Sequence, residues 1–318
     1  MMDGLLPLVP PHELTARWRA LRASDPRLTI TEVATRLDVS EAELVASLCG
    51  DGIIRLVGPY GDLVRSLPSL GAVRAVTRNA HASIETLGIY PAPDAGCAGA
   101  VGEIGARFLL DQWRYGYALD DVDTQGLHRS LRFFDDRGDP VHEMFAGADT
   151  SQTQLGRLID LFACFDQSQG EEITRPSLLA RRATCDAGLS LRHVDSARPV
   201  GRAALSAVLE VVLGDAVPVS IAVRSLGVVQ RYSGLLHEAD VIGDVCRMRA
   251  PRVRIQIRTD RIVEAWVVRT PSLDGSTLSL ELLDARAASI VSLSGARWPG
   301  QPEPLAWREV LDSLTTAA

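Results

Sequence analysis

A sequence pattern that occurs twice constrains the fold of this chain more than any other feature. The first copy, residues 107–139, has an apolar run that ends at Trp113, followed by Ser130-Leu-Arg-Phe-Phe-Asp135. The second copy, residues 261–284, has Val263-Glu-Ala-Trp266, followed by Ser279-Leu-Glu-Leu-Leu-Asp284. In each copy a loop with Asp and Gly separates the tryptophan from the motif. We therefore predict one two-stranded antiparallel unit in each half of the chain.

A second match lies upstream of the first and in the same order. Residues 75–88 resemble residues 221–234, and the first strand of each stretch ends in an arginine, Arg78 or Arg224. These arginines are 146 positions apart, whereas the aspartates that close the later motif are 149 positions apart. Such a nearly constant offset is typical of a duplicated domain, since a solenoid has short repeat units.

The repeat divides the chain into halves of unequal content. We expect a first half at residues 1–166, a linker at residues 167–199 and a second half at residues 200–318. The first half begins with a helical front end, residues 12–67, most of which the second half lacks. Each half is predicted to be a large antiparallel β-sheet flanked by helices, so the fold class is α+β by tandem duplication.

Local signals define the expected helices and strands. In the front end, Thr29 or Thr31 can cap a helix that reaches Leu37, and Ser40 with Glu43 gives a capping-box signal for the next helix. Alternating apolar and polar residues predict strands with one buried face. The predicted strands are residues 53–57, 72–78, 83–89, 104–110, 112–119, 128–134, 141–145, 217–224, 228–233, 252–257, 262–269, 277–283 and 289–293.

Composition excludes several classes of protein. The net charge of −7 argues against a general nucleic-acid binder. The chain has no lysine, so all 33 of its basic residues are arginine, which excludes Schiff-base lysines and P-loop lysines. A carboxylate or phosphate ligand must therefore be bound by arginine, whose planar guanidinium group suits bidentate contacts.

The sequence also bears on the compartment. No apolar run approaches the roughly 18–20 residues that span a bilayer, so no membrane insertion is expected. Residues 1–11 have no basic leader and no small-residue cleavage site, so a signal peptide is not expected. The five cysteines include no Cys-x-x-Cys pair, which favours reduced thiols. We expect a cytoplasmic protein.

Several motifs together resemble one bacterial family. Arg107-Phe-Leu-Leu-Asp-Gln-Trp113, Phe133-Phe-Asp-Asp-Arg-Gly-Asp139 and Val263-Glu-Ala-Trp-Val-Val-Arg269 are similar to the haemin-degrading or haem-trafficking factors, the HemS/ChuS/PhuS family. The resemblance covers roughly residues 12–315 and includes the duplication. It implies a cytoplasmic haem-binding protein of iron acquisition, with a haem importer and a haem oxygenase as partners, which in some members degrades haem.

The resemblance also implies where haem binds. The arginine of the family's first half corresponds to Arg107, and an arginine after the last strand corresponds to Arg297. The family's histidine ligand falls in a segment that is shorter in this chain, where His193 is the nearest histidine and the expected iron ligand. Cys97 lies where members can carry a histidine, and a thiolate is also a haem ligand. Tyr115 is a candidate for lining the cleft.

Each candidate has a structural alternative. His193 can be a solvated linker histidine, and Cys97 a small residue in a glycine-rich loop. Tyr115 can pack in the sheet instead. An arginine within an apolar strand costs desolvation energy, so Arg107 is expected to meet a haem propionate or a neighbouring carboxylate.

Two other readings of the chain stay open. One is a family member that has lost the usual haem ligand and binds another planar ligand or a protein partner, because the family's polar positions near the last strands are Thr270, Ser292 and Ser294 here. The other is a helix-turn-helix regulator, since residues 30–45 resemble that motif. Its second helix carries Glu41 and Glu43, which DNA phosphates repel. Haem degradation is the enzyme activity that the resemblance implies, and a monomer or homodimer is expected.

Overall fold

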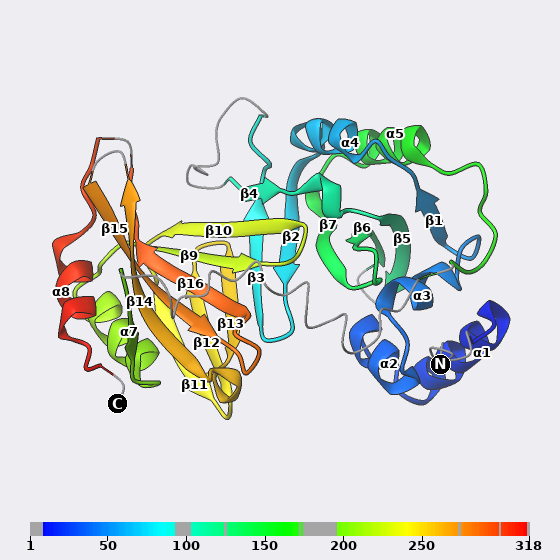
Figure 1. The fold of residues 1–318 in the computed structure, drawn as a ribbon. Helices are drawn as coiled ribbons and strands as arrows, with labels where there is room; N and C mark the ends of the chain where they lie inside the picture. Colours follow the sequence, from blue (N-terminus) through cyan, green and yellow to red (C-terminus); the bar gives the residue numbers. More distant parts are fainter. Residues whose placement is uncertain are drawn as a thin grey trace. The chain divides into compact units, whose positions relative to one another are not determined.

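The computed structural model describes residues 9–92, 103–123, 126–171, 173, 196–272, 275–298 and 300–316, and all side chains in these ranges except those of residues 121–123, 126–128, 272 and 275. The chain forms two compact units (Figure 1). The first contains residues 1–74 and 109–177, and the second contains residues 75–108 and 178–318. Residues 75–108 therefore belong to the same unit as the second sequence copy.

Short helices open the first unit, and two of them begin with the expected caps. The side chains of Thr29 and Ser40 accept hydrogen bonds of 3.2 Å from the backbone N–H groups of Glu32 and Glu43, and both glutamates bond back to the caps. These reciprocal capping boxes fix where the helices begin. The helices of this unit are α1 (Pro11–Ser24), α2 (Ile30–Leu37), α3 (Glu41–Ala46), α4 (Tyr60–Ser66), the 3₁₀ helices η1 (Leu67–Leu70) and η2 (Leu110–Gln112), and α5 (Gln152–Phe162).

The first copy of the repeat forms an antiparallel hairpin in this unit. Strand β5 (Tyr115–Asp123) pairs with β6 (Gly126–Phe134) from Tyr115 opposite Phe134 to Asp123 opposite Gly126, which confirms the predicted unit. Strands β1 (Ile53–Leu56) and β7 (Pro140–Thr150) continue the sheet on either side of the hairpin.

The second copy forms the same hairpin in the second unit. Strand β14 (Glu264–Ser272) pairs with β15 (Gly275–Leu283), from Glu264 opposite Leu283 to Ser272 opposite Gly275. The hairpin lies in a seven-stranded sheet. The sheet's order is β4 (Gly105–Phe108), β10 (Val228–Gly234), β9 (Val219–Arg224), β16 (Ser289–Gly295), β15, β14 and β8 (Ala197–Val200).

The other sheet of the chain includes the β5–β6 hairpin described above. It has nine strands, in the order β1-β5-β6-β7-β2-β3-β13-β12-β11. Its strand β2 (Gly71–Arg78) begins in the first unit and ends in the second, which holds β3 (Ala82–Gly88) and β13 (Val253–Arg258). The remaining strands, β11 (Glu238–Ile242) and β12 (Val245–Ala250), form a hairpin that the sequence reading missed. Its turn contains Gly243 at φ +60°, a conformation that glycine adopts without strain.

Strands from the two halves of the sequence pair with each other in the second unit. Strand β3 of the first half pairs antiparallel with β13 of the second half, and β4 of the first half pairs antiparallel with β10 of the second half. This exchange explains why residues 75–108 belong to the second unit.

The aspartate that ends each motif closes a tight turn. The Asp135 carboxylate accepts hydrogen bonds of 2.9 Å from the backbone N–H groups of Arg137 and Asp139. The Asp284 carboxylate does the same for Arg286 and Ala288, at 2.8 and 2.9 Å. The repeated aspartate therefore has a structural role, since its side chain organises the turn into the next strand.

Each unit has its own hydrophobic core. In the first, helix α3 packs on one face of the β5–β6 hairpin, with Val45 and Ala46 in one cluster with Tyr117, Leu119 and Phe134. In the second, helices α7 (Ala204–Gly214) and α8 (Leu305–Ser313) share a cluster with inward residues of the seven-stranded sheet. Within the described residues, no helix is long and apolar enough to cross a membrane.

Candidate functional site

The seven-stranded sheet has one apolar and one polar face. Apolar residues of β9, β15 and β16, such as Ile221, Leu280 and Leu293, belong to the core cluster with α7 and α8. Because side chains alternate along a strand, the residues between them lie on the opposite face, here called the polar face. Its described residues on strands β4, β10, β9, β16 and β15 include Gly105, Arg107, Val229, Arg231, Ser233, Ser220, Ala222, Arg224, Ser292, Ser294, Thr277, Ser279 and Glu281.

Arg107 lies on this polar face, at the edge of the sheet. In the pairing of β4 with β10 it is opposite Val229. The sequence predicted Arg107 inside an apolar strand, but β4 ends at Phe108 and the Arg107 side chain is exposed, so it bears no large desolvation cost. In the described part of the chain, Arg107 makes no ion pair or side-chain hydrogen bond. None of the described carboxylates therefore pairs with Arg107, and its guanidinium group is available to a ligand.

Hydroxyl groups and one carboxylate occupy the middle of the polar face. The Glu281 Oε1 atom accepts hydrogen bonds of 2.7 Å from both Ser279 and Ser292. On neighbouring strands, the Ser233 hydroxyl donates to Ser220 at 3.1 Å. These hydroxyl groups and the carboxylate make the middle of the face polar.

Arg297 marks the far end of the same face. It follows β16 and donates a hydrogen bond of 2.9 Å to the Thr277 hydroxyl. By strand geometry it lies roughly 25 Å from Arg107. It also lies in the electrostatic surroundings of Glu303. Burial raises the pKa of Glu303 above its ordinary value, and the hydrogen bond to Leu278 and the charges of Arg308 and Arg297 offset part of that rise. Arg297 is thus partly engaged with the residues around the start of α8.

Tyr115 belongs to the first unit, whereas Arg107 and Arg297 belong to the second. It is opposite Phe134 in the β5–β6 hairpin and packs partly buried against the cluster under α3. Burial raises the pKa of its hydroxyl group. Within its own unit its surroundings are those of a packing residue.

The two expected iron ligands, His193 and Cys97, lie outside the described residues. Among the residues that are described, no group of three or more His, Cys, Asp and Glu side chains is arranged to hold a metal ion. His142, on β7, is fully buried near Trp113, with ring centroids 6.3 Å apart, and burial lowers its pKa to about 4. A buried neutral histidine of this kind is part of the first unit's core.

The helix-turn-helix reading conflicts with the position of α3. All six residues of this helix are buried, including Glu41 and Glu43. A recognition helix must place side chains in the major groove. Helix α3 instead packs against the sheet, so it has no face to offer DNA.

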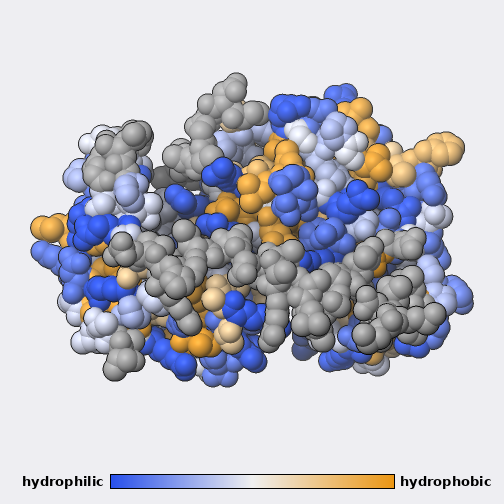
Figure 2. Space-filling view, viewed as in Figure 1, coloured by the Kyte–Doolittle hydropathy of each residue, from blue (hydrophilic) through white to orange (hydrophobic). Residues whose placement is uncertain are grey.

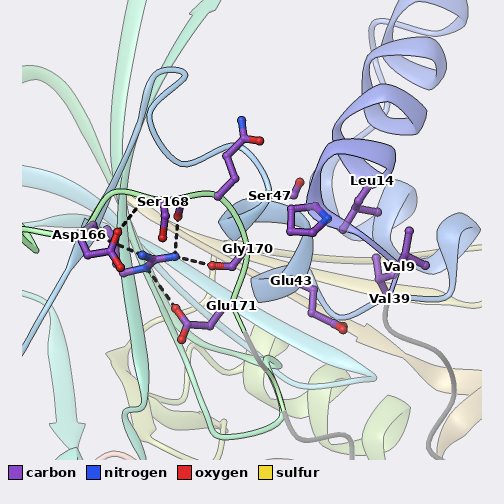
Figure 3. A pocket seen from close by; sticks show the side chains of 12 residues that line it. Val9, Leu14, Val39, Glu43, Ser47, Asp166, Ser168, Gly170 and Glu171 are labelled. Atoms are coloured by element: carbon purple, nitrogen blue, oxygen red, sulfur yellow. Dashed lines mark hydrogen bonds and ion pairs between the residues drawn. The ribbon is translucent and has the colours of Figure 1, made fainter.

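A cavity of about 450 Å³ lies in the first unit (Figure 3). Its apolar wall contains Val9, Leu14 and Val39, and Asp166, Ser168 and Glu171 lie on its other side. Arg55 also lines the cavity. The Arg55 guanidinium group donates hydrogen bonds to the backbone carbonyl groups of Asp166, Ser168 and Gly170.

The Glu171 carboxylate completes the surroundings of Arg55. Its Oε2 atom lies 3.1 Å from Arg55 Nε and 3.4 Å from the Tyr117 hydroxyl. Burial raises the pKa of Tyr117, and the Glu171 carboxylate raises it further. Because Arg55 already bonds to three carbonyl groups and a carboxylate, it anchors residues 166–171 beside β1 and is not free to bind an anion in the cavity.

The exposed surface holds apolar side chains in a few places (Figure 2). In the first unit, Leu161 and Phe165 follow one another closely at the end of α5 and are 75% and 105% exposed. Ile54 of strand β1 and Val57, just after that strand, are also exposed.

The chain belongs to a known family. The model of the haemin-degrading HemS.ChuX domain matches residues 38–162 and 183–314, so each sequence copy matches one segment. Among curated proteins, the hemin transport protein HemS of Yersinia enterocolitica is 27% identical and covers 92% of this chain and 94% of its own length. The hemin transport protein HmuS of Yersinia pestis is 28% identical with the same coverage.

Solved structures share the fold over nearly the whole chain. The crystal structure of holo-PhuS, a heme-binding protein from Pseudomonas aeruginosa, has a TM-score of 0.85 at 27% identity and covers 97% of this chain and 100% of its own. The heme-degrading enzyme ChuS of Escherichia coli O157:H7 has a TM-score of 0.81 at 24% identity and covers 96% of this chain and 99% of its own. This second match is evidence for the fold only. These matches confirm the α+β fold with a tandem duplication.

Proposed function

We propose that this protein is a cytoplasmic haem-binding protein of bacterial haem uptake, which receives haem from an importer and delivers it to a haem oxygenase. The haem lies on the polar face of the seven-stranded sheet. The observation that carries this proposal is Arg107, an exposed guanidinium group on this face with no acidic partner among the described residues. The hemin transport names of two curated relatives and the heme-binding name of PhuS support it.

The proposed roles follow from position and chemistry. Arg107 faces the bound haem, and Arg297 meets a propionate from the far end of the polar face. His193 is the proposed axial ligand, with Cys97 as the alternative, because neutral imidazole and thiolate both bind haem iron. Tyr115 is retained as a secondary candidate.

Two organisational proposals accompany this function. The sequence copies are bounded at residues 1–166 and 200–318, with residues 167–199 as the linker between them. The protein acts as a monomer or homodimer, which sedimentation with and without haem measures directly.

A haem titration tests the function. We expect a saturable shift of the Soret band on adding haem to the pure protein, and Arg107→Ala should weaken binding about tenfold, as loss of a charge-assisted hydrogen bond does. His193→Ala should change the spectrum of the bound haem. The matched control is Arg249→Ala, which removes an exposed arginine of β12 that pairs with Glu238. No saturable shift would remove the haem proposal and leave another planar ligand or a protein partner as the function to test.

Haem degradation is the second candidate, favoured by the description of the family as haemin-degrading. The iron and the porphyrin supply the oxygen chemistry, so this chain contributes orientation and exclusion of water. Adding reductant and oxygen to the haem complex should bleach the Soret band. Bleaching that catalase abolishes would instead come from free peroxide and would contradict enzymatic degradation.

A further inference from the structure

The nine-stranded sheet ends on one side at β11, and this edge is open in the part of the chain that the structure describes (Figure 1). The opposite edge, β1, is covered, since the Cys164 N–H donates a hydrogen bond of 2.8 Å to the carbonyl group of Arg55. On the outer side of β11, no described residue makes such a bond. An open edge presents unpaired backbone groups, which are a template for another strand.

The register of the β11–β12 hairpin determines which backbone groups of β11 point outward. Ile242 is opposite Val245, and two residues form the loop between them. Residues that flank a two-residue loop bond to each other, and the bonded positions then alternate along an antiparallel pair. The N–H and C=O groups of Ala239 and Val241 therefore point away from β12 and lie along the open edge.

The side chains of β11 alternate between an apolar and a polar face. Val241 is opposite Cys246, which belongs to the apolar core of the second unit, and Ala239 packs against the same core. Asp240 lies on the other face, opposite Arg247. Val241 is 60% exposed although it is on the core side, so the apolar face of the sheet continues to the open edge.

We infer that β11 pairs with β11 of a second copy of this chain, antiparallel and about a two-fold axis, so that the sheets of two molecules become continuous. The axis passes between the two Asp240 residues, and Ala239 of each copy is opposite Val241 of the other. This register bonds all the outward backbone groups, and it keeps apolar side chains on one face and polar side chains on the other. A contact of one surface with itself closes as a dimer.

The charges near the axis balance in this register. Each Asp240 is opposite Arg247 of its own copy, and the buried Nε atom of Arg247 has no hydrogen-bond partner among the described residues. The row across the dimer therefore has two carboxylates with a guanidinium group on either side, and it is neutral as a whole. The two carboxylates still repel each other, because like charges directly opposite destabilise an antiparallel pair. Since the contact is also small, we expect a dimer that dissociates on dilution.

Sedimentation velocity over about 1–200 µM protein tests the pairing, and we expect a monomer–dimer equilibrium. Val241→Pro removes an outward N–H group and leaves the bonds to β12 intact, because an edge strand tolerates proline where the N–H faces solvent. This variant should weaken the dimer at least tenfold. The matched control is Val241→Thr, which keeps both the N–H group and a β-branched side chain and should weaken the dimer far less.

Cysteine cross-linking tests the register. Asp240→Cys places two thiols in the non-hydrogen-bonded pair on the axis, where Cα atoms lie about 4.5 Å apart, within the range of a disulfide. Oxidation with diamide should therefore give a covalent dimer on a non-reducing gel. Glu238→Cys is the matched control, since Glu238 is also exposed on this strand but lies about 13 Å from its counterpart along the strand. The control should not cross-link.

A third variant should strengthen the dimer, a gain that misfolding cannot produce. Asp240→Asn removes the repulsion on the axis and should tighten the dimer about fivefold at low salt, and less at high salt. Circular dichroism shows whether Val241→Pro is folded, and if it is not, the Asp240 variants alone decide.

Three results would overturn the pairing. They are a monomer at every concentration, equal weakening by the proline and threonine variants, and equal cross-linking of the two cysteine variants. Strand β11 carries none of the proposed haem-binding residues, so the pairing and the haem function stand or fall separately.

Discussion

The two copies of the repeated hairpin, β5–β6 and β14–β15, have the same strand pairing, but different side chains surround them. In the first copy Arg132 is opposite Glu143 and Ser130 is opposite Phe145. At the matching positions of the second copy, Glu281 is opposite Ser292 and Ser279 is opposite Ser294. The register is the same, and the side chains on this face differ.

In the first copy this face is covered. Tyr117 and Phe134 are fully buried in the cluster under α3. Further along the face, Arg132 pairs with Glu143 at 3.5 Å, and the Arg74 guanidinium group lies 3.9 Å from the Phe145 ring centroid. Helix, ion pair and cation–π contact together leave no room for a ligand there.

In the second copy the equivalent face carries serines, one glutamate and, on the neighbouring strands, the exposed arginines Arg107, Arg224 and Arg231. The described residues place no counterpart of α3 on it. A duplicated sheet can therefore support a hydrophobic core in one copy and a polar face in the other, and the difference depends on a few side chains and on the helical front end.

The largest expected effect on stability comes from truncating the apolar residue that precedes the motif aspartate in each copy. Phe134→Ala should lower the free energy of unfolding by about 3–5 kcal/mol, because Phe134 is fully buried between α3 and the sheet. Leu283→Ala, at the matching position, should cost only about 2 kcal/mol, since Leu283 belongs to a small cluster with Trp266 and Val268. Chemical denaturation measures both, and equal losses would contradict the contrast between a covered and an open face.

An intermediate effect is expected at the turn of the first copy. Burial raises the pKa of Asp135 to about 6, and the nearby Asp139 carboxylate adds to the rise. Between about pH 4 and pH 6 this group is protonated in the folded state and ionised in the unfolded state, so its contribution to stability falls as the pH rises.

The substitution Asp135→Asn tests this pH dependence. The amide oxygen can still accept the N–H groups of Arg137 and Asp139, but the group no longer ionises. The stability of the variant relative to the unaltered protein should therefore increase by about 2–3 kcal/mol from pH 4 to pH 7. Denaturation curves at a series of pH values measure it. A stability difference that stays constant with pH would show that the pKa of Asp135 is the same in the folded and unfolded states and would contradict the raised pKa.

The smallest effect is expected from placing the first copy's aromatic residue on the second copy's open face. Ser294→Phe puts a phenylalanine at the position that matches Phe145. Stability should stay within about 0.5 kcal/mol, as for surface substitutions, whereas haem binding should weaken because the ring occupies the space above the sheet. A destabilisation of more than about 1 kcal/mol would indicate overpacking and hence a face that is already covered.

The sequence was most informative where neighbouring residues decide the structure. The two hairpins and the capping boxes at Thr29 and Ser40 were predictable, since each depends on local periodicity or on residues three positions apart. The role of the repeated aspartates was also within reach, because Asp commonly bonds to the backbone two residues on in a turn.

Long-range pairing could not be predicted in the same way. Nothing local indicates that β4 pairs with β10, and this pairing alone brings Arg107 beside Arg224 and Arg231. For the same reason Arg107 was expected in a buried strand, whereas it lies exposed on an edge strand. The sequence reading used Arg224 only as a marker of the repeat, and Arg231 was not singled out at all.

The exchange of strands between the two copies has a consequence for the ancestry of the fold. A chain with one copy alone would leave its equivalents of β3 and β4 without the partners they have here, and unpaired strand edges readily join another chain. Such an ancestor would complete its sheets by swapping strands with a second molecule, as a symmetric pair does. Fusion of the two genes makes this pairing intramolecular, and each copy then becomes free to diverge without losing its match to an identical partner.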